Sequence, residues 1–244
     1  MNAPKFLSSG DSAITVEFGN EISADINACV HALDKALRKK NILGIVETVP
    51  TFRSLLIIYD PCITGGEKLK AKITKLCGDL EASSEGRKRI IEIPVLYGGE
   101  YGEDLKDVAE INKLTEDEVV KIHSGTDYLI YMLGFLPGFA YLGGLDPRLH
   151  TPRLDSPRTC IPAGSVGIGG AQTGVYPLAS PGGWQLLGRT PVSVFDRQRQ
   201  EPILYRAGDL VHFVPISPAE YEEIARAVAA GTYTVQVEEV PVCD

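Results

Sequence analysis

Lysine is missing from the whole second half of the chain. The 244 residues include 24 lysines and arginines, yet after Lys121 every strongly basic side chain is an arginine. This absence excludes from the second half a P-loop, a Ser-x-x-Lys nucleophile and a Schiff-base lysine, since all three need the amine. An anion bound there must be bound by arginine, by backbone N–H groups or by a partner.

Long apolar runs and paired cysteines are also absent. No run approaches the ~20 residues that span a bilayer, and the N-terminus lacks a basic start followed by an apolar core. We therefore expect a cytoplasmic protein without a membrane partner. The five cysteines contain no CxxC pair, which argues against a disulfide framework and a zinc site, and we predict no bound metal. A formal net charge of −8 disfavours nucleic acid as a partner.

The first ninety residues have the pattern of a compact α/β unit. Apolar runs predict strands at 13–18, 45–49, 54–59 and 89–95. Two amphipathic helices lie between them, with apolar faces formed by Ile22, Ile26, Val30, Leu33 and Leu37, and by Leu69, Ile73, Leu76 and Leu80. The order β-α-β-β-α-β is that of the ferredoxin-like split unit. We therefore expect an α+β protein with a ferredoxin-like α/β domain over residues 1–90.

From residue 91 onward the sequence consists mostly of short apolar runs and turns. A helix is expected to begin at Thr115, which opens a Ser/Thr-x-x-Glu capping box, and another at Ser217, which is followed by proline at the first helical position. The runs at 128–133, 166–168, 192–195 and 210–214 predict short strands. Many short strands with turns between them indicate an antiparallel barrel or sandwich over residues 91–244.

The stretch from Gly134 to Pro191 is rich in glycine and proline and also contains aromatic residues and arginines. Linkers are low in complexity, so this mixture indicates ordered loops around a ligand. Glycine lets backbone N–H groups approach a bound molecule, and arginine offers a planar fork to a carboxylate or phosphate. A β-rich domain with tight turns also accumulates glycine and proline, and both interpretations stay open for any single glycine.

Three of the arginines in this stretch are candidates for binding an anion, namely Arg153, Arg158 and Arg189. We expect at least one of them to bind a carboxylate or phosphoryl group. Trp184, the only tryptophan, is either a core residue or a lid over a small ring. Gln172 is suited to recognising an amide.

His123 ends a predicted helix just before the β-rich region. A histidine at a helix C-terminus is favoured by the helix dipole, and a histidine beside a binding region can act as a ligand or as an acid–base group. The sequence supports both interpretations equally.

Three long motifs carry a resemblance to one known family. They are GFLPGFAYLGGLDPRL from residue 134, PAGSVGIGG with QTGVYP from residue 162, and SPGGWQLLGRTP from residue 180. They resemble the family of B subunits of bacterial ATP-dependent 5-oxoprolinases, a carboxyltransferase C–D domain family. Its relatives include the sporulation-kinase inhibitor KipI and proteins named allophanate hydrolase subunit 1. The resemblance covers nearly the full chain, including GDSAITVEFG near the start.

The resemblance implies a fold, partners and a reaction. The fold would be an N-terminal α/β domain followed by a cyclophilin-like antiparallel β-barrel. The protein would be inactive alone and would join a hetero-oligomeric hydrolase with two partners: the 5-oxoprolinase C subunit, similar to allophanate hydrolase subunit 2, and the A subunit, of the LamB/YcsF type. That complex would open the lactam of 5-oxoproline to L-glutamate, with ATP and Mg²⁺ as co-substrate and no tightly bound cofactor.

The resemblance also suggests which residues surround a shared nucleotide and substrate pocket. We expect catalytic roles for His123, Arg158 and Arg189. The expected substrate-binding residues are Pro137, Gly138, Phe139, Gln172, Ser180, Pro181, Gly182, Gly183 and Trp184. Because the second half lacks lysine, we expect the C subunit to supply part of the phosphoryl site. The alternative function is a regulatory protein that inhibits a sporulation-type sensor histidine kinase.

Overall fold

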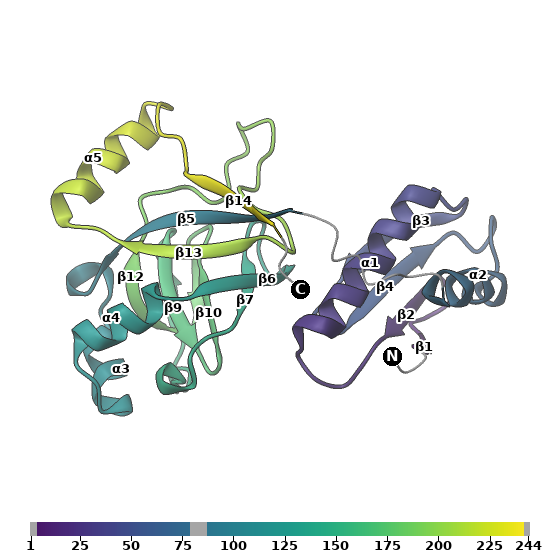
Figure 1. The fold of residues 1–244 in the computed structure, drawn as a ribbon, viewed down its shortest axis with the longest axis horizontal. Helices are drawn as coiled ribbons and strands as arrows, with labels where there is room; N and C mark the ends of the chain where they lie inside the picture. The colour runs from purple at the N-terminus through teal and green to yellow at the C-terminus, as the bar shows by residue number, and fades with distance from the viewer. Residues whose placement is uncertain (1–3, 79–86, 242–244) are drawn as a thin grey trace. The chain divides into compact units, whose positions relative to one another are not determined.

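The computed structural model describes residues 4–78 and 87–241, which form two compact units (Figure 1). The first unit ends before Arg87 and the second extends from Arg87 to Pro241. Leu80 of the predicted second helix, residues 81–86 and Cys243 lie outside the described residues. Within the described ranges, no helix is both long enough and apolar enough to cross a membrane.

The first unit is a four-stranded antiparallel sheet with two helices on one face. The strand order is β1-β2-β4-β3. The strands are β1 (Lys5–Ser8), β2 (Ala13–Glu17), β3 (Ile45–Pro50) and β4 (Ser54–Tyr59), and the helices are α1 (Ala24–Lys40) and α2 (Gly66–Gly78). Both helices bury their apolar faces in one core, where Leu33 and Leu69 join Val16 and Ile57 of the sheet. Both predicted helices are therefore confirmed, although Ile22 precedes α1 and is 59% exposed.

The expected ferredoxin-like arrangement is not confirmed for this unit. The run at 89–95 does form a strand, β5 (Arg87–Tyr97), but β5 pairs with β12, β13 and β14 of the second unit. The strand at 89–95 was expected as the fourth strand of the first sheet, but it does not belong to that sheet. The fourth strand is instead the short β1, in which Phe6 packs against the core while its neighbours are exposed. One partly buried residue in four gives too little periodicity to predict a strand.

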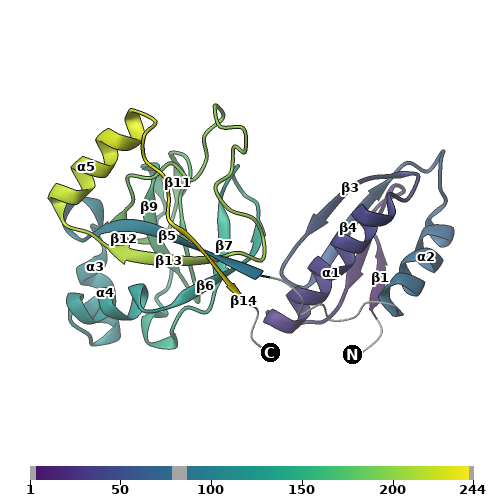
Figure 2. The same ribbon diagram turned by 45° about the horizontal axis from the view of Figure 1, so that its top comes forward.

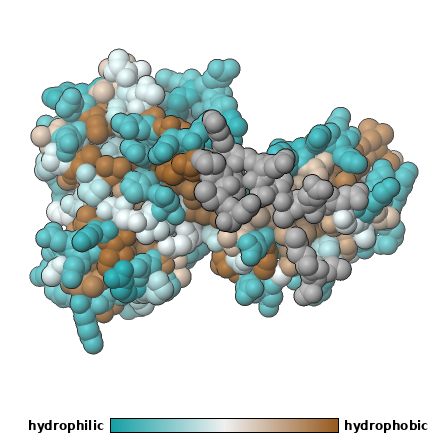
Figure 3. Space-filling model, in the orientation of Figure 1, coloured by the Kyte–Doolittle hydropathy of each residue, from teal (hydrophilic) through white to brown (hydrophobic). Residues whose placement is uncertain are grey.

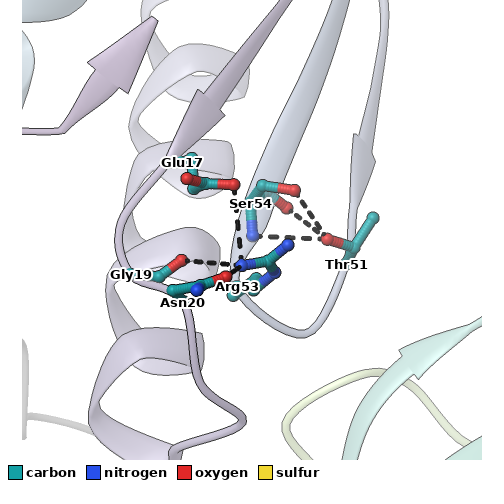
Figure 4. Close-up of polar contacts among 6 residues, drawn as sticks. All are labelled: Glu17, Gly19, Asn20, Thr51, Arg53 and Ser54. Atoms are coloured by element: carbon teal, nitrogen blue, oxygen red, sulfur yellow. Dashed lines mark hydrogen bonds and ion pairs between the residues drawn. The ribbon is translucent and has the colours of Figure 1, made fainter. Parts of the chain in front are cut away.

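A small polar network fixes the turn between β3 and β4 (Figure 4). Arg53 donates from Nη1 to the carbonyl oxygen of Gly19 at 3.4 Å and to the side-chain oxygen of Asn20. Thr51 Oγ1 donates to the carbonyl oxygen of Ser54 at 2.9 Å and accepts from its N–H at 3.3 Å. These bonds satisfy polar groups at a sharp reversal of the chain, so the turn holds β3 and β4 in register.

The second unit contains a closed barrel, as predicted. Among the described residues, seven strands close in the order β12-β9-β10-β7-β6-β13-β5, because β5 pairs with β12 as well as with β13. Besides β5, they are β6 (Asp127–Leu133), β7 (Ala140–Gly143), β9 (Ser165–Gly169), β10 (Gln172–Val175), β12 (Gln185–Arg189) and β13 (Leu210–Pro215). The barrel is not wholly antiparallel, since β5 and β13 are parallel.

Three further strands lie outside this ring. β14 (Val237–Pro241) extends the sheet along β5, and β8 (Arg158–Ile161) pairs with β11 (Ser180–Gly182) as a separate two-stranded sheet. The predicted run at 192–195 forms only an isolated bridge between Phe195 and Ile203.

Helices lie on two sides of the strand pair β5–β13. α3 (Leu105–Asn112) and α4 (Glu116–Ser124) lie on one side and α5 (Pro218–Ala229) on the other, as Figures 1 and 2 show. The short 3-10 helices η1 (Gly99–Tyr101) and η2 (Pro147–Leu149) precede α3 and β8. The interior is apolar, with Tyr128, Tyr205 and Phe213 among its largest buried side chains. On the face of this unit visible in Figure 3, hydrophilic residues surround separate apolar patches.

The predicted capping box at Thr115 is present, and the predicted helix start at Ser217 also carries one. Thr115 Oγ1 accepts from the N–H of Glu118 at 3.2 Å, and the Glu118 carboxylate accepts from the N–H of Thr115 at 2.8 Å. Ser217 and Glu220 make the same pair at the start of α5.

Removing the first of these caps tests its contribution to stability. Thr115→Ala should lower the free energy of unfolding by about 1 kcal/mol, since the N–H of Glu118 at the start of α4 loses its side-chain acceptor. Thr115→Ser keeps the hydroxyl and should stay near the wild-type value. Urea denaturation measures both, and equal stability of the alanine variant and the wild type would contradict the assignment.

Candidate functional site

The glycine- and proline-rich stretch forms a cavity of ≈ 120 Å³, which we call the aromatic pocket. Its lining residues are Phe135, Phe139, Tyr141, Arg153, Tyr176, Pro181, Gly182, Gly183 and Trp184. Five of the nine residues expected to bind substrate line it, namely Phe139 and the run from Pro181 to Trp184. The chain therefore brings together side chains from the loop before β7, the segment before β8, and the β11–β12 connection.

Phe139 lies at the centre of the aromatic pocket. Its ring meets those of Phe135, Tyr141, Tyr176 and Trp184 edge-on, with centroids 5.2–5.6 Å apart. Edge-to-face packing at this distance is favourable and fixes the rings relative to one another. Phe135 is 64% exposed and has a φ of 63°. Because bulky residues rarely adopt positive φ, the loop holds this ring at the rim against a conformational cost.

Glycine is required at two positions beneath these rings. A Cβ on Gly169 would lie 2.3 Å from Nε1 of Trp184, so the indole packs directly on the backbone of β9. A Cβ on Gly182 would lie 2.6 Å from the hydroxyl oxygen of Tyr176. Both distances are far below van der Waals contact, so these glycines serve close packing of the pocket wall.

Arg153 is the basic group of the aromatic pocket, and the backbone on both sides of it is anchored. The carbonyl of the preceding proline accepts from Nε2 of Gln185 at 3.0 Å, and the N–H of Leu154 donates to the carbonyl of Gly183 at 2.7 Å. The guanidinium carbon lies 6.0 Å from the centroid of Trp184. The side chain is exposed, and no ion-pair partner for it is found among the described residues.

Arg158 lies outside the pocket lining and is bound to a buried carboxylate. Its Nη2 is 2.7 Å from Oδ1 of Asp104, whose side chain is 6% exposed, and 3.6 Å from Glu103. The other oxygen of Asp104 accepts from the N–H of Leu186 at 2.6 Å. The hydrogen bond with Asp104 raises the pKa of Arg158. This arginine therefore ties the segment before α3 to β8 and β12.

Arg189 is also engaged elsewhere in the second unit. Its guanidinium carbon lies 5.1 Å from the ring centroid of Tyr101, which in turn contacts Tyr221 of α5 at 4.8 Å. Its Nε is buried without a hydrogen-bond partner in the part of the chain that the structure describes. A cation over an aromatic ring is a stabilising contact, so Arg189 joins β12 to η1 and α5.

His123 lies in the barrel interior and is fully buried. Tyr97 lies 2.8 Å from its Nδ1, and Thr173 Oγ1 lies 2.8 Å from its Nε2 and donates to the carbonyl of Gly167 at 3.0 Å. Because Thr173 uses its proton on that carbonyl, His123 donates from Nε2 and accepts from Tyr97 at Nδ1. Burial lowers the pKa of His123 to about 3. This placement favours the structural interpretation over an acid–base role.

The other residues that were expected to bind substrate do not line the pocket. Pro137 and Gly138 form the turn before Phe139, and the Gly138 carbonyl accepts from the hydroxyl of Tyr205 at 2.8 Å. Gln172 is half-buried at the start of β10. The hydroxyl of Ser180 is buried and has no hydrogen-bond partner among the described residues.

Residues 4–205 match the family model for the carboxyltransferase domain, subdomains C and D. The chain belongs to this family. It is 46% identical to the 5-oxoprolinase B subunit of Bacillus subtilis (strain 168) over 222 residues, which cover 87% of this chain and 92% of that protein. It is 44% identical to the 5-oxoprolinase B subunit of Escherichia coli O157:H7 over 206 residues, 84% of this chain and 93% of that protein. The resemblance to 5-oxoprolinase B subunits is confirmed.

A solved structure supports the fold of this carboxyltransferase family member. The urea carboxylase of Kluyveromyces lactis aligns with 97% of this chain and 24% of its own chain, with a TM-score of 0.81 at 24% identity. At this level of identity the likeness concerns the fold alone. The barrel is thus an architecture that is shared with a distant carboxylase.

A second cavity, of ≈ 440 Å³, lies beside α4 and was not predicted from the sequence. Its charged groups are partly engaged, since Glu118 caps α4 and Arg148 pairs with Asp146 at 2.7 Å. Within the described ranges, no cluster of three histidine, cysteine or acidic residues is arranged to hold a metal ion.

No site role was predicted for Phe135, Tyr141 or Tyr176, and catalytic roles were expected for Arg158 and Arg189 rather than for Arg153. The available signal was the spacing of aromatic residues among the glycines. That spacing indicates aromatic side chains in loops that bind a ligand, but it does not show which of these side chains contact one another in the fold.

Stability of this family member should depend on pH through His123. Its pKa is about 3 in the fold, against 6.5 for an ordinary histidine, so the unfolded chain binds more protons between these values. Stability is then full above about pH 6.5 and falls toward pH 3, by up to about 1.4 kcal/mol per pH unit. Denaturation at pH 7 and pH 5 should show a smaller loss in His123→Gln than in the wild type. The control His150→Gln should keep the wild-type loss, and an equal loss in all three proteins would contradict this role of His123.

Two neighbouring glycines provide a matched test of the pocket wall. Gly182→Ala should lower the melting temperature, because the new methyl group meets Tyr176 at 2.6 Å and Ile161 at 2.8 Å. Gly183→Ala meets its nearest neighbours only at 3.6 Å, so its melting temperature should stay close to the wild-type value. Calorimetry of both variants decides the matter, and a larger drop for Gly183→Ala would contradict the described packing.

Proposed function

We propose that this chain is the B subunit of an ATP-dependent 5-oxoprolinase, which opens 5-oxoproline to L-glutamate. The observation that carries the proposal is the high identity to two 5-oxoprolinase B subunits over nearly their whole length. The aromatic pocket adds support, because the motifs that carried the family resemblance form its walls.

The chemistry of the proposed reaction explains the need for ATP. A lactam carbonyl is a poor electrophile, and transfer of the γ-phosphoryl group from ATP to its oxygen activates the carbon and releases ADP. Water then adds to this carbon, and the ring C–N bond breaks as the nitrogen takes up a proton, which leaves glutamyl phosphate. A second water hydrolyses this acyl phosphate to glutamate and inorganic phosphate. We propose that Mg²⁺ binds with ATP and neutralises negative charge on its phosphate oxygens.

The arrangement of basic groups suggests a division of labour between subunits. Arg158 is bound to Asp104 and Arg189 packs on Tyr101, while the chain after Lys121 has no lysine. Of the three candidate arginines, only Arg153 is therefore left to meet the charge of a triphosphate beside the pocket. We propose that the aromatic pocket binds 5-oxoproline and that the two partners, the C and A subunits, supply most of the nucleotide site. Such an enzyme would act in the cytoplasm, where ATP is available.

Reconstitution tests this function. The chain is co-expressed with the C and A subunits of a 5-oxoprolinase, and glutamate release from 5-oxoproline is measured with and without ATP. We expect activity that requires ATP and all three proteins, and loss of activity when any one is omitted. An assembled complex that releases no glutamate would contradict the proposal. Inhibition of histidine kinase autophosphorylation by the purified chain would then favour the regulatory alternative.

A further inference from the structure

The structure separates the three candidate arginines of the glycine- and proline-rich stretch. Arg158 is paired with a buried carboxylate and Arg189 lies over a tyrosine ring. Of the three, only Arg153 lines the aromatic pocket, and its guanidinium group forms no ion pair with another described residue. A carboxylate that enters this pocket would therefore meet one guanidinium group, that of Arg153.

The size and lining of the aromatic pocket limit its ligand. Its volume of ≈ 120 Å³ lies well below the roughly 300–1,000 Å³ of sites for drug-sized molecules. Five aromatic rings line it and one cationic side chain lies beside Trp184. Such a site fits one small ring packed between aromatic faces and bearing a single negative group within reach of the arginine.

We propose that the aromatic pocket binds a small-ring carboxylate and that Arg153 is the specificity-determining residue that pairs with its carboxylate. The ring would pack against Trp184 and Phe139. 5-Oxoproline, a five-membered lactam with one carboxylate, fits this description. Naming it as the ligand rests on the proposed function. The lactam bond would then face the open side of the pocket, where a partner protein could present the phosphoryl group.

The local structure explains why Arg153 suits this task. Hydrogen bonds from Gln185 and Leu154 fix its backbone beside Trp184, while its exposed side chain is free to close over a ligand. The planar fork of arginine binds both oxygens of a carboxylate, and a lysine ammonium binds as a point charge. Arg153→Lys should therefore keep only part of the affinity.

The single tryptophan provides a direct measurement. Trp184 lines the aromatic pocket and is the only tryptophan in the chain, so its fluorescence in the purified chain reports on this pocket alone. Titration with 5-oxoproline should give a saturable change. Arg153→Gln should weaken binding roughly 10- to 100-fold, with Arg153→Lys in between. Binding of 2-pyrrolidone, the same ring without a carboxylate, should be weak and equal in wild type and Arg153→Gln.

The reconstituted complex gives a second measurement and separates the two proposals. Arg153→Gln should raise the KM for 5-oxoproline by a similar factor and leave kcat within a few-fold of wild type. Arg197→Gln, an exposed arginine outside the pocket, is the matched control and should keep the wild-type KM. An active complex whose KM is unchanged by Arg153→Gln overturns the role of Arg153 and leaves the proposed function intact.

Two other outcomes are equally decisive. If the complex lacks 5-oxoprolinase activity but the chain binds 5-oxoproline in an Arg153-dependent way, the proposed function fails and the carboxylate site stands. If 5-oxoproline causes no saturable change in Trp184 fluorescence while a proline-containing peptide does, the pocket binds a protein segment and the carboxylate site is overturned.

Discussion

The buried carboxylate of Asp104 joins parts of the second unit that lie far apart in the sequence. One oxygen holds Arg158 at the start of β8, and the other accepts from the N–H of Leu186 in β12. β8 pairs with β11, and β12 follows Trp184 directly, so both walls of the aromatic pocket depend on this one side chain. Loss of one partner from such a buried pair typically costs several kcal/mol, because the other charge stays in the interior unpaired.

Features that depend on residues close together in the sequence, such as helix starts, were predicted well. The capping boxes at Thr115 and Ser217 were visible because their partners lie three residues away. Pairing between strands was harder. β5 alternates buried and partly exposed residues along Ile91 and Ile93, a pattern that fits either sheet, and only its long-range partners β12 and β13 decide between them.

The same limit applied to the candidate site. Nothing near Arg158 or Arg189 in the sequence reveals Asp104 or Tyr101, so both were expected to face a ligand, and Arg153 was given no catalytic role. His123 likewise carried no sign of Thr173, which lies fifty residues away and uses its proton on the Gly167 carbonyl. The aromatic residues were conspicuous because five of them interrupt a stretch of glycine and proline. Their convergence on Phe139 could be recognised only once the strands were in place.

The parallel pair of β5 and β13 has a consequence for biosynthesis. β5 begins at Arg87, but its barrel neighbour β13 ends only at Pro215. The two strands cannot pair until the chain between them has been synthesised, and pairing over such a long sequence separation is slow. While the ribosome is still adding the intervening residues, the edge of β5 that later pairs with β13 has no neighbouring strand. The nascent chain therefore carries an open apolar strand edge through about half of its synthesis, and it is during this interval that the protein depends most on protection from aggregation.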